Sequence, residues 1–200
     1  MNKKGVFVCI EGLDGSGKTT QAKLLTERLS KNYDAVYTSE PSNGKTGTFL
    51  RECCLYEEKR LPAPAEALLF AADRVEHVEN EIKPALARGK IVVCDRYVYS
   101  SLAYQGSTGV NLAWIKEINS HALQPDFAIF IDVPPEQVLE RLMRKKSVME
   151  TLEIQRKVRD IYMEFVQKGE LALVDGDKPV DELAKTLFSK VSSLINPAST

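Results

Sequence analysis

One run of residues has the types and the spacing of a phosphate-binding loop: Gly12-Leu13-Asp14-Gly15-Ser16-Gly17-Lys18-Thr19. The run matches G-x-x-x-x-G-K-[ST] in full, follows an apolar stretch and precedes a helical pattern, which is the context this motif requires. Glycines let the backbone turn so tightly that successive N–H groups face phosphate oxygens, next to the positive end of a helix. Lys18 supplies a mobile cation for the β- and γ-phosphates, and Thr19 supplies a hard oxygen ligand for Mg²⁺. The motif therefore predicts binding of a nucleoside triphosphate.

Cationic side chains elsewhere in the chain could hold a second, anionic substrate in line with the triphosphate. Arg74 lies on a predicted helix one turn after Phe70, and Asp95-Arg96 follows a predicted strand, where α/β sheets place ligands. Further basic residues lie near a helix end and could belong to a closing lid: Arg141, Arg144, Lys145 and Lys146. Each of these groups could equally be structural, as an ion pair or a solvated helix end. Spacing alone therefore predicts a P-loop kinase whose acceptor is not identified.

Two other classes of P-loop protein fit the sequence less well. A GTP-binding switch needs a guanine-reading N-K-x-D segment, which the sequence lacks. An ATPase driven by nucleic acid is expected to carry a basic surface, whereas 27 Lys and Arg against 28 Asp and Glu give a formal net charge of −1. The balance indicates no nucleic acid polymer as a partner. A nucleotide-dependent interaction protein that binds ATP without turnover is a further alternative.

The elements that must position these residues alternate between short apolar runs and longer helical periodicities, as in a parallel sheet covered by helices. The predicted strands are Val6–Ile10, Ala35–Thr38, Ile91–Cys94, Phe127–Val133 and Ala172–Val174. Helices are predicted over Thr19–Leu29, from about 65 to 88, from Pro134-Pro135 onward, around Ile154–Phe165 and over Val180–Leu194. Pro84 is expected to kink or interrupt the second helix, and Gly89 to end it.

These patterns predict one α/β domain over residues 1–200, a P-loop NTPase with a doubly wound, five-stranded parallel sheet and helices on both faces. The apolar runs are too short to span a membrane, and the first residues do not resemble a signal peptide. Four cysteines without a C-x-x-C pattern indicate reduced structural thiols in a cytoplasmic protein.

Four sequence blocks together resemble the thymidylate kinase family. They are Ile10–Gln21, Glu40-Pro41, Leu69–Arg74 and Asp95–Gln105, and the likeness covers nearly the whole chain. The resemblance implies an enzyme that transfers the γ-phosphoryl group of ATP to dTMP, giving dTDP and ADP in dTTP biosynthesis. It also implies Mg²⁺ as cofactor, a short lid at about residues 144–150 and a homodimer. A kinase for another nucleoside monophosphate or a small metabolite is the alternative.

On matching residues, the resemblance implies a donor site built on the loop. The implied ATP-binding residues are Gly12, Leu13, Asp14, Gly15, Ser16, Gly17, Lys18, Thr19, Thr20, Arg141 and Arg144. Thr19 and Asp95 would hold Mg²⁺, with Asp132 at the end of another strand as the rival of Asp95. The implied catalytic residues are Lys18, Arg96, Asp95 and Asp14.

The resemblance likewise implies an acceptor site. The implied dTMP-binding residues are Asp14, Glu40, Pro41, Phe70, Arg74, Arg96, Ser101, Tyr104 and Gln105. Phe70 would stack on the thymine ring, Arg74 would donate to a thymine carbonyl, and Ser101 would bind the base edge. Tyr104 would lie near the 2′ carbon of the sugar and disfavour a ribonucleotide.

In the acceptor phosphate region, the resemblance implies that Asp14 accepts from the 3′-hydroxyl and that Arg96 bridges the acceptor phosphate and the γ-phosphate. No general base is required, because the attacking phosphate oxygen is already ionised at neutral pH. We therefore assign no catalytic role to His77 or His121.

The sequence departs from the family pattern at three places. Ser39 stands where bacterial members usually have arginine, so one cation near the acceptor phosphate is missing. Gly15 stands where some eukaryotic members carry arginine, so a transition-state cation must come from the short lid region, with Arg141 and Arg144 as candidates. Arg159 matches an arginine that follows the lid, and its role is the least defined of these.

Overall fold

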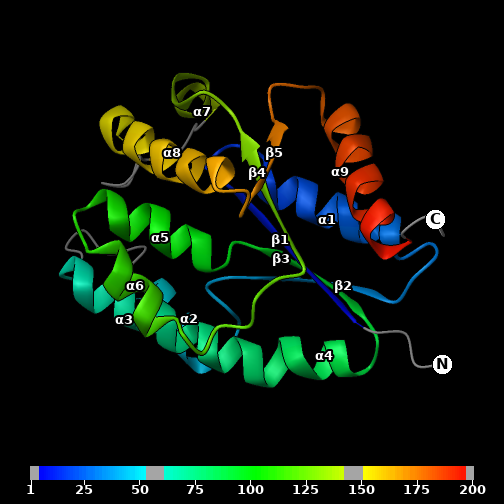
Figure 1. Cartoon of the computed structure of the whole chain (residues 1–200), viewed down its shortest axis with the longest axis horizontal. Helices are drawn as coiled ribbons and strands as arrows, with labels where there is room; N and C mark the ends of the chain where they lie inside the picture. Colours follow the sequence, from blue (N-terminus) through cyan, green and yellow to red (C-terminus); the bar gives the residue numbers. More distant parts are fainter. Residues whose placement is uncertain (1–4, 53–60, 142–150, 197–200) are drawn as a thin grey trace.

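A computed structural model describes residues 5–52, 61–141 and 151–196, and its centre is a five-stranded parallel sheet (Figure 1). The strands are β1 Val6–Gly12, β2 Ala35–Ser39, β3 Ile91–Asp95, β4 Phe127–Asp132 and β5 Ala172–Asp175. Their order across the sheet is β2-β3-β1-β4-β5, and every neighbouring pair is parallel. The predicted α/β fold and its sheet are confirmed.

Helices cover both faces of the sheet, as predicted (Figure 1). Their bounds are α1 Lys18–Leu29, α2 Lys45–Leu50, α3 Ala63–His77, α4 Lys83–Ala87, α5 Val98–Ser107, α6 Leu112–Ile118, α7 Pro135–Arg141, α8 Leu152–Gln167 and α9 Val180–Ile195. Helix α1 packs on β1, β2, β3 and α9, whereas α5 packs on β1 and α8, and α8 packs on β4. A buried apolar cluster joins residues of β1, β3, β4 and β5 to helices of both faces. A single domain over residues 1–200 is our prediction, and this cluster supports it.

The central strands are apolar on both faces because helices bury both. Phe7, Val8, Cys9 and Ile10 of β1 are fully buried. Cys9 lies opposite Cys94 in the parallel register of β1 and β3, and both are free thiols whose pKa is raised by burial. These two cysteines agree with the prediction of structural thiols, while Cys53 and Cys54 lie outside the described residues.

The helix predicted from about 65 to 88 is interrupted before Pro84, and the interruption is a π-helical segment, Val78–Ile82, between α3 and α4. Proline removes a backbone donor and its ring crowds the preceding turn, so the local hydrogen-bond pattern must widen. Gly89 follows the end of α4 with a φ of 76°, as expected for the residue that ends a helix.

Within the described ranges, three helices were not predicted from the sequence: α2, α5 and α6. Helix α5 is buried on almost every side, so it has no polar face and no amphipathic period to reveal it. No helix in the described part of the chain is both long and apolar enough to cross a bilayer.

Candidate active site at the carboxyl ends of the strands

The carboxyl ends of the strands meet at one edge of the sheet, and the segments that follow them form the candidate site. Strand β1 leads into Leu13–Gly17, β2 leads into Glu40-Pro41, and β3 leads into Arg96. The Arg96 amide donates to the Ile10 carbonyl, and the Glu40 amide donates to the Asp95 carbonyl, each at 3.0 Å. Backbone hydrogen bonds therefore hold the three segments side by side.

The loop after β1 has the geometry of a phosphate cradle. Gly15 and Gly17 adopt φ values of 89° and 88°, a region that side chains disfavour. A Cβ atom at Gly12 would lie 2.5 Å from the Ser16 hydroxyl, which is buried without a partner among the described residues. Helix α1 begins at once, with the Gln21 amide bonded to the Gly17 carbonyl at 3.0 Å. The amides of the first turn have no acceptor within the helix and can bind phosphate oxygens.

Lys18 lies within the loop rather than in solvent. Its Nζ atom donates to the Leu13 carbonyl at 3.2 Å and to Asp14 Oδ1 at 3.3 Å. Burial and the nearby Arg96 charge lower the pKa of Lys18, and the Asp14 charge opposes that change. Lys18 is thus held at the cradle by a carbonyl and a carboxylate, and a triphosphate would be a further anionic partner.

Thr19 and Asp95 lie together in a way that fits Mg²⁺. The Thr19 hydroxyl donates to Asp95 Oδ2 at 2.5 Å, and the Tyr37 hydroxyl lies 3.4 Å from the same oxygen. Asp95 Oδ1 is buried and has no hydrogen-bond partner within the described residues. A hydroxyl and a carboxylate beside a phosphate cradle are oxygen ligands that Mg²⁺ accepts, together with phosphate and water oxygens.

Asp132, the rival candidate for the metal, is engaged elsewhere. Arg159 Nε donates to its Oδ1 at 2.7 Å and Arg159 Nη2 donates to its Oδ2 at 2.8 Å. Such a fork-shaped pair uses both carboxylate oxygens and raises the pKa of Arg159 through the hydrogen bond with Asp132. Both carboxylate oxygens of Asp132 are therefore engaged by Arg159, whereas Asp95 keeps one oxygen without a partner among the described residues.

Arg96 forms an ion pair with Asp14 across the mouth of the loop. Its Nη1 atom also donates to the Ser100 hydroxyl at 3.0 Å, and its φ of 70° is unusual for a residue with a side chain. Burial alone would raise the pKa of Asp14, but the charges of Arg96 and Lys18 hold it well below its usual range. Burial alone would lower the pKa of Arg96, but Asp14 raises it well above its usual value. The pair is ionised throughout the neutral range.

Tyr104 of α5 lies beside this ion pair. Its hydroxyl accepts from the Asp14 amide at 3.0 Å, and the Arg96 guanidinium lies over its ring at 5.0 Å from the centroid. Burial raises the pKa of Tyr104 above its ordinary value, so the hydroxyl stays protonated. Gln105 is buried next in sequence, and its Oε1 atom has no partner among the described residues.

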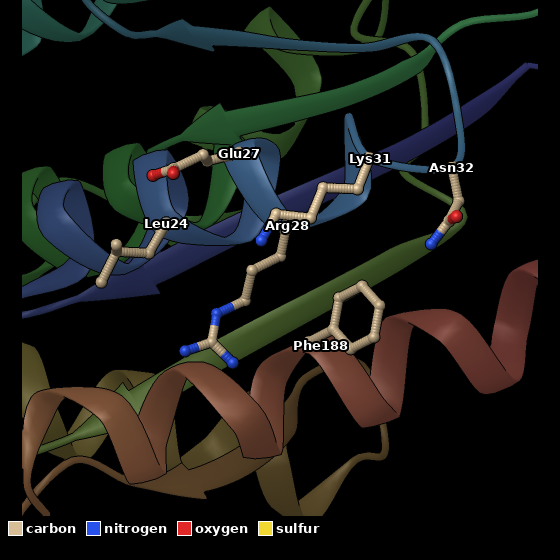
Figure 2. Close-up of a pocket in the computed structure, with 6 residues that line it drawn as sticks. All are labelled: Leu24, Glu27, Arg28, Lys31, Asn32 and Phe188. Atoms are coloured by element: carbon tan, nitrogen blue, oxygen red, sulfur yellow. The ribbon is translucent and has the colours of Figure 1, made fainter.

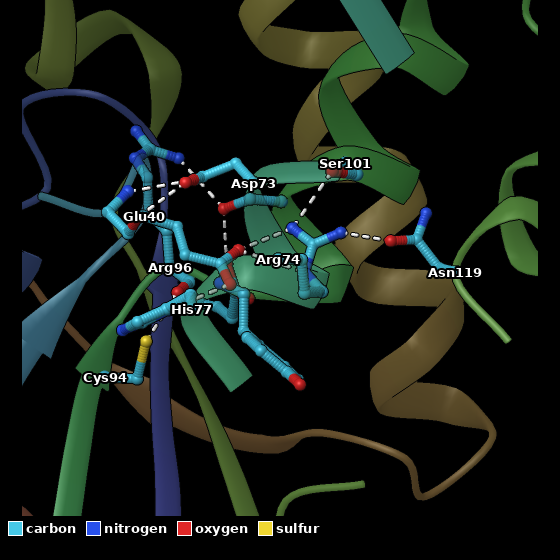
Figure 3. Close-up of polar contacts among 12 residues, drawn as sticks. Glu40, Asp73, Arg74, His77, Cys94, Arg96, Ser101 and Asn119 are labelled. Atoms are coloured by element: carbon cyan, nitrogen blue, oxygen red, sulfur yellow. Dashed lines mark hydrogen bonds and ion pairs between the residues drawn. The ribbon is translucent and has the colours of Figure 1, made fainter. Parts of the chain in front are cut away.

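Arg74 of α3 is the centre of a buried polar cluster (Figure 3). Its Nε and Nη2 atoms donate to Glu40 Oε2 at 3.0 and 2.6 Å, and Nη2 also donates to Ser101 at 3.2 Å. Nη1 donates to Asn119, and the guanidinium lies 5.1 Å from the centre of the Tyr97 ring. Arginine has five N–H groups, and these contacts with described residues use four of them, leaving one on Nη1.

Glu40 and His77 belong to the same cluster (Figure 3). The His77 ring lies 2.7 Å from the Thr38 hydroxyl through Nε2 and 3.3 Å from Glu40 Oε1 through Nδ1. Glu40 is buried, and its carboxylate accepts hydrogen bonds from Arg74. Its neighbour Pro41 is half-buried, and the peptide bond between them is cis.

Comparison with known proteins extends this picture to a family. A family model described as thymidylate kinase matches residues 10–187. The chain belongs to the thymidylate kinase family. It is similar to a probable thymidylate kinase of Pyrococcus abyssi (strain GE5 / Orsay), with 44% identity over 94% of this chain and 96% of the relative. A probable thymidylate kinase of Staphylothermus marinus is 41% identical over 90% of each chain. The protein is therefore an enzyme of the class that phosphorylates dTMP.

The structure brings most of the residues that we predicted for this thymidylate kinase to one edge of the sheet. Phe70 is half-buried on α3 one turn before Arg74, so the two share a helix face. Arg141 lies apart at the end of α7, half-exposed, with Asp177 at 3.3 Å. Arg144 and the predicted lid at 144–150 lie outside the described residues.

Sequence reasoning missed several residues that the thymidylate kinase fold places at the site. Asn119 directly follows α6 and Tyr162 lies in α8, and neither residue is part of a recognisable motif. Glu11 was quoted within a motif but given no role. Arg51 donates to the Pro41 carbonyl at 2.7 Å, so a cation lies near the place where Ser39 lacks one. Only the spacing of Arg51 behind Glu40-Pro41 could have indicated it.

A hollow of about 380 Å³ lies between α1 and α9 at the end of α1 away from the phosphate loop (Figure 2). Its lining residues are Leu24, Glu27, Arg28, Lys31, Asn32 and Phe188. It contains none of the residues predicted for the thymidylate kinase reaction.

Proposed function

We propose that this thymidylate kinase transfers the γ-phosphoryl group of ATP to dTMP between the loop Gly12–Thr19 and Arg96. The observation that carries the proposal is the Arg96–Asp14 ion pair at the phosphate loop, in which Asp14 also accepts from Lys18. An arginine at that position can contact both the donor and the acceptor phosphate and offset their repulsion.

On the donor side, we propose that the first amides of α1 and Lys18 bind the β- and γ-phosphates of ATP. Thr19 and Asp95 would hold Mg²⁺, which when bound supplies positive charge to the phosphate oxygens. Thr20 is exposed at the same helix start and completes the proposed set with the loop residues.

On the acceptor side, we propose that Phe70 stacks on thymine and that the remaining N–H of Arg74 donates to a thymine carbonyl. The buried contacts of Arg74 with Glu40, Asn119 and Ser101 fix its guanidinium before substrate binds, so little conformational entropy is lost on binding. A fixed N–H donor matches the carbonyl of thymine and not the amino group of cytosine.

Around the sugar and phosphate, we propose that Tyr104 and Gln105 lie along the 2′ side of the sugar and that Asp14 accepts from the 3′-hydroxyl. Arg96 would orient the acceptor phosphate, and Arg51, beside Pro41, would add the charge that Ser39 does not supply. A phosphate oxygen of dTMP then attacks the γ-phosphorus, the bond to the β-phosphate oxygen breaks, and dTDP and ADP leave. Since that oxygen is ionised at neutral pH, no side chain needs to remove a proton.

A panel of nucleoside monophosphates tests this assignment. The enzyme is incubated with Mg-ATP and dTMP, dUMP, dCMP or dGMP, and ADP release is measured together with the phosphorylated product. Selective stimulation by dTMP supports the proposal. Stimulation by a different acceptor would favour the related monophosphate kinase, and ATP binding without any turnover would favour an interaction protein.

We further propose a homodimer in the cytoplasm, where ATP and dTMP are available to such an enzyme. The outer face of α3 carries Leu68 and Val75 at 50% and 39% exposure, and Phe49 of α2 is 48% exposed. Helices α2 and α3 pack together, so these side chains lie on neighbouring elements that a second copy could cover. Sedimentation of the purified protein tests this, with Leu68→Glu expected to yield monomers.

A further inference from the structure

We propose that Glu11 is a positioning residue that orients Arg96 for phosphoryl transfer. The inference rests on the proposed function, since it concerns the same arginine. Glu11 is the residue of β1 just before the phosphate loop, and its side chain is fully buried. Burying a carboxylate costs free energy unless it is paired or hydrogen-bonded, so the partners of Glu11 indicate what it does.

Glu11 makes no hydrogen bond with Arg96 itself but binds two groups that hold Arg96 in place. Its Oε1 atom accepts from the Tyr97 amide at 2.9 Å, which holds the peptide immediately after Arg96. Its Oε2 atom accepts from the Ser100 hydroxyl at 2.6 Å, and that hydroxyl oxygen accepts from Arg96 Nη1 at 3.0 Å. The first contact supports the backbone of Arg96, whose φ is 70°, and the second supports its side chain.

The direction of the hydroxyl hydrogens makes the charge of Glu11 important. The Tyr162 hydroxyl of α8 also donates to Glu11 Oε2, at 2.9 Å, and lies 3.1 Å from the Ser100 hydroxyl. An ionised carboxylate only accepts, so both hydroxyls direct their single hydrogen at it and Ser100 presents a lone pair to Arg96. A protonated carboxyl or an amide at position 11 would donate, and one hydroxyl would have to turn away.

The surroundings make this arrangement sensitive to pH. Burial raises the pKa of Glu11 to about 6, opposed by Ser100, by the charge of Arg96, by Tyr162 and by the Tyr97 amide. The titratable and charged groups around it are Cys9 on β1, Arg74 on α3, Cys94 on β3, Arg96 after β3, Tyr97 and Tyr99 at α5, and Tyr162 on α8. Among the groups that lower the pKa of Glu11, the Ser100 hydroxyl has the largest effect and the positive charge of Arg96 the next largest.

Glu11→Gln tests the proposal, with kcat and both KM values measured at saturating Mg²⁺ from pH 5.5 to 8. We expect kcat at pH 7.5 to fall about 10- to 100-fold while the KM values for ATP and dTMP change less than about threefold, because misplacing a reacting group acts on the transition state. The ratio of wild-type to variant kcat should shrink as the pH falls through about 6, since both proteins then carry a neutral side chain. Substrate ionisation affects both proteins alike and cancels in the ratio.

Tyr162→Phe provides a second test that keeps the buried ring and the carboxylate. It removes one donor to Glu11, so the acid limb of kcat should move upward by about 0.5 pH unit. Tyr99→Phe is the matched control. Tyr99 is also near Glu11, but its hydroxyl bonds the Glu170 carbonyl at 3.4 Å rather than the Glu11 carboxylate, so the limb should not move.

The outcomes are separable from those of the proposed function. Wild-type enzyme that does not phosphorylate dTMP refutes the function. Wild-type enzyme that is active, combined with a Glu11→Gln kcat within threefold of it or a ratio independent of pH, refutes the positioning role. If Glu11→Gln does not fold, an acid limb that is the same in Tyr162→Phe and wild type refutes it instead.

Discussion

The buried charge of Glu11 should make the stability of the protein fall as the pH rises. The pKa of Glu11 is about 6 in the folded protein against 4.5 for an ordinary glutamate. Between these values the folded state binds more protons at this position than the unfolded chain does, so unfolding becomes easier with increasing pH. A difference of about 1.5 pKa units corresponds to about 2 kcal/mol at pH 7, relative to acid below pH 4.5.

Glu11→Gln isolates this contribution, since the variant cannot ionise at that position. We expect the free energy of unfolding of the variant, minus that of wild type, to rise by about 2 kcal/mol from pH 4.5 to pH 7. For a chain of this size that is about 4–8 °C in Tm. Urea unfolding at a series of pH values measures the difference, and Glu164→Gln, in an exposed pair on α8, controls for the loss of one carboxylate. A difference that is flat with pH, or that falls, would refute the assignment of the buried charge.

Three further predictions concern the substrate contacts. Arg96→Ala should lower kcat about 10³-fold with the KM for ATP nearly unchanged, because the arginine acts on charge that develops in the transition state. Steady-state kinetics measure this effect, with the exposed Arg156→Ala as the control. An equal loss of kcat in both variants would contradict the prediction. Phe70→Ala should raise the KM for dTMP about tenfold or more through lost stacking, and an unchanged KM in initial-rate assays would return Phe70 to a packing role. Asp95→Asn should raise the free Mg²⁺ concentration for half-maximal rate about tenfold, and a magnesium titration at fixed ATP that matches wild type would remove Asp95 from the metal.

The sheet was predictable because a parallel strand buried on both faces appears in the sequence as a continuous apolar run. The errors lie mainly at the carboxyl ends. Strand β1 continues to Gly12 and β3 to Asp95, each beyond its predicted apolar run. The additional strand residues are polar or glycine because the strands end in the site. Hydrophobicity therefore does not indicate the last residues of a strand that ends at the candidate site.

The donor half of the site was predictable in the same way, because a contiguous loop contains most of it. The acceptor half depends on contacts between residues far apart in the chain. Asn119 and Ser101 meet Arg74 only after α3, α5 and α6 pack together, and α5 itself lacks an amphipathic pattern. Glu11 and Tyr162 are 151 residues apart, and neither type is distinctive on its own.

The register of β1 against β3 has a consequence for how the enzyme can move. Ile10 lies opposite Asp95, and the Arg96 amide continues the ladder to the Ile10 carbonyl. The strand residue before the phosphate loop and the backbone of Arg96 are thus joined by consecutive backbone hydrogen bonds in the middle of the sheet. Sliding them apart would break several backbone hydrogen bonds at once, so their separation is as fixed as the spacing of the strands. Any closing and opening during turnover must therefore move other segments relative to this fixed β1–β3 pairing.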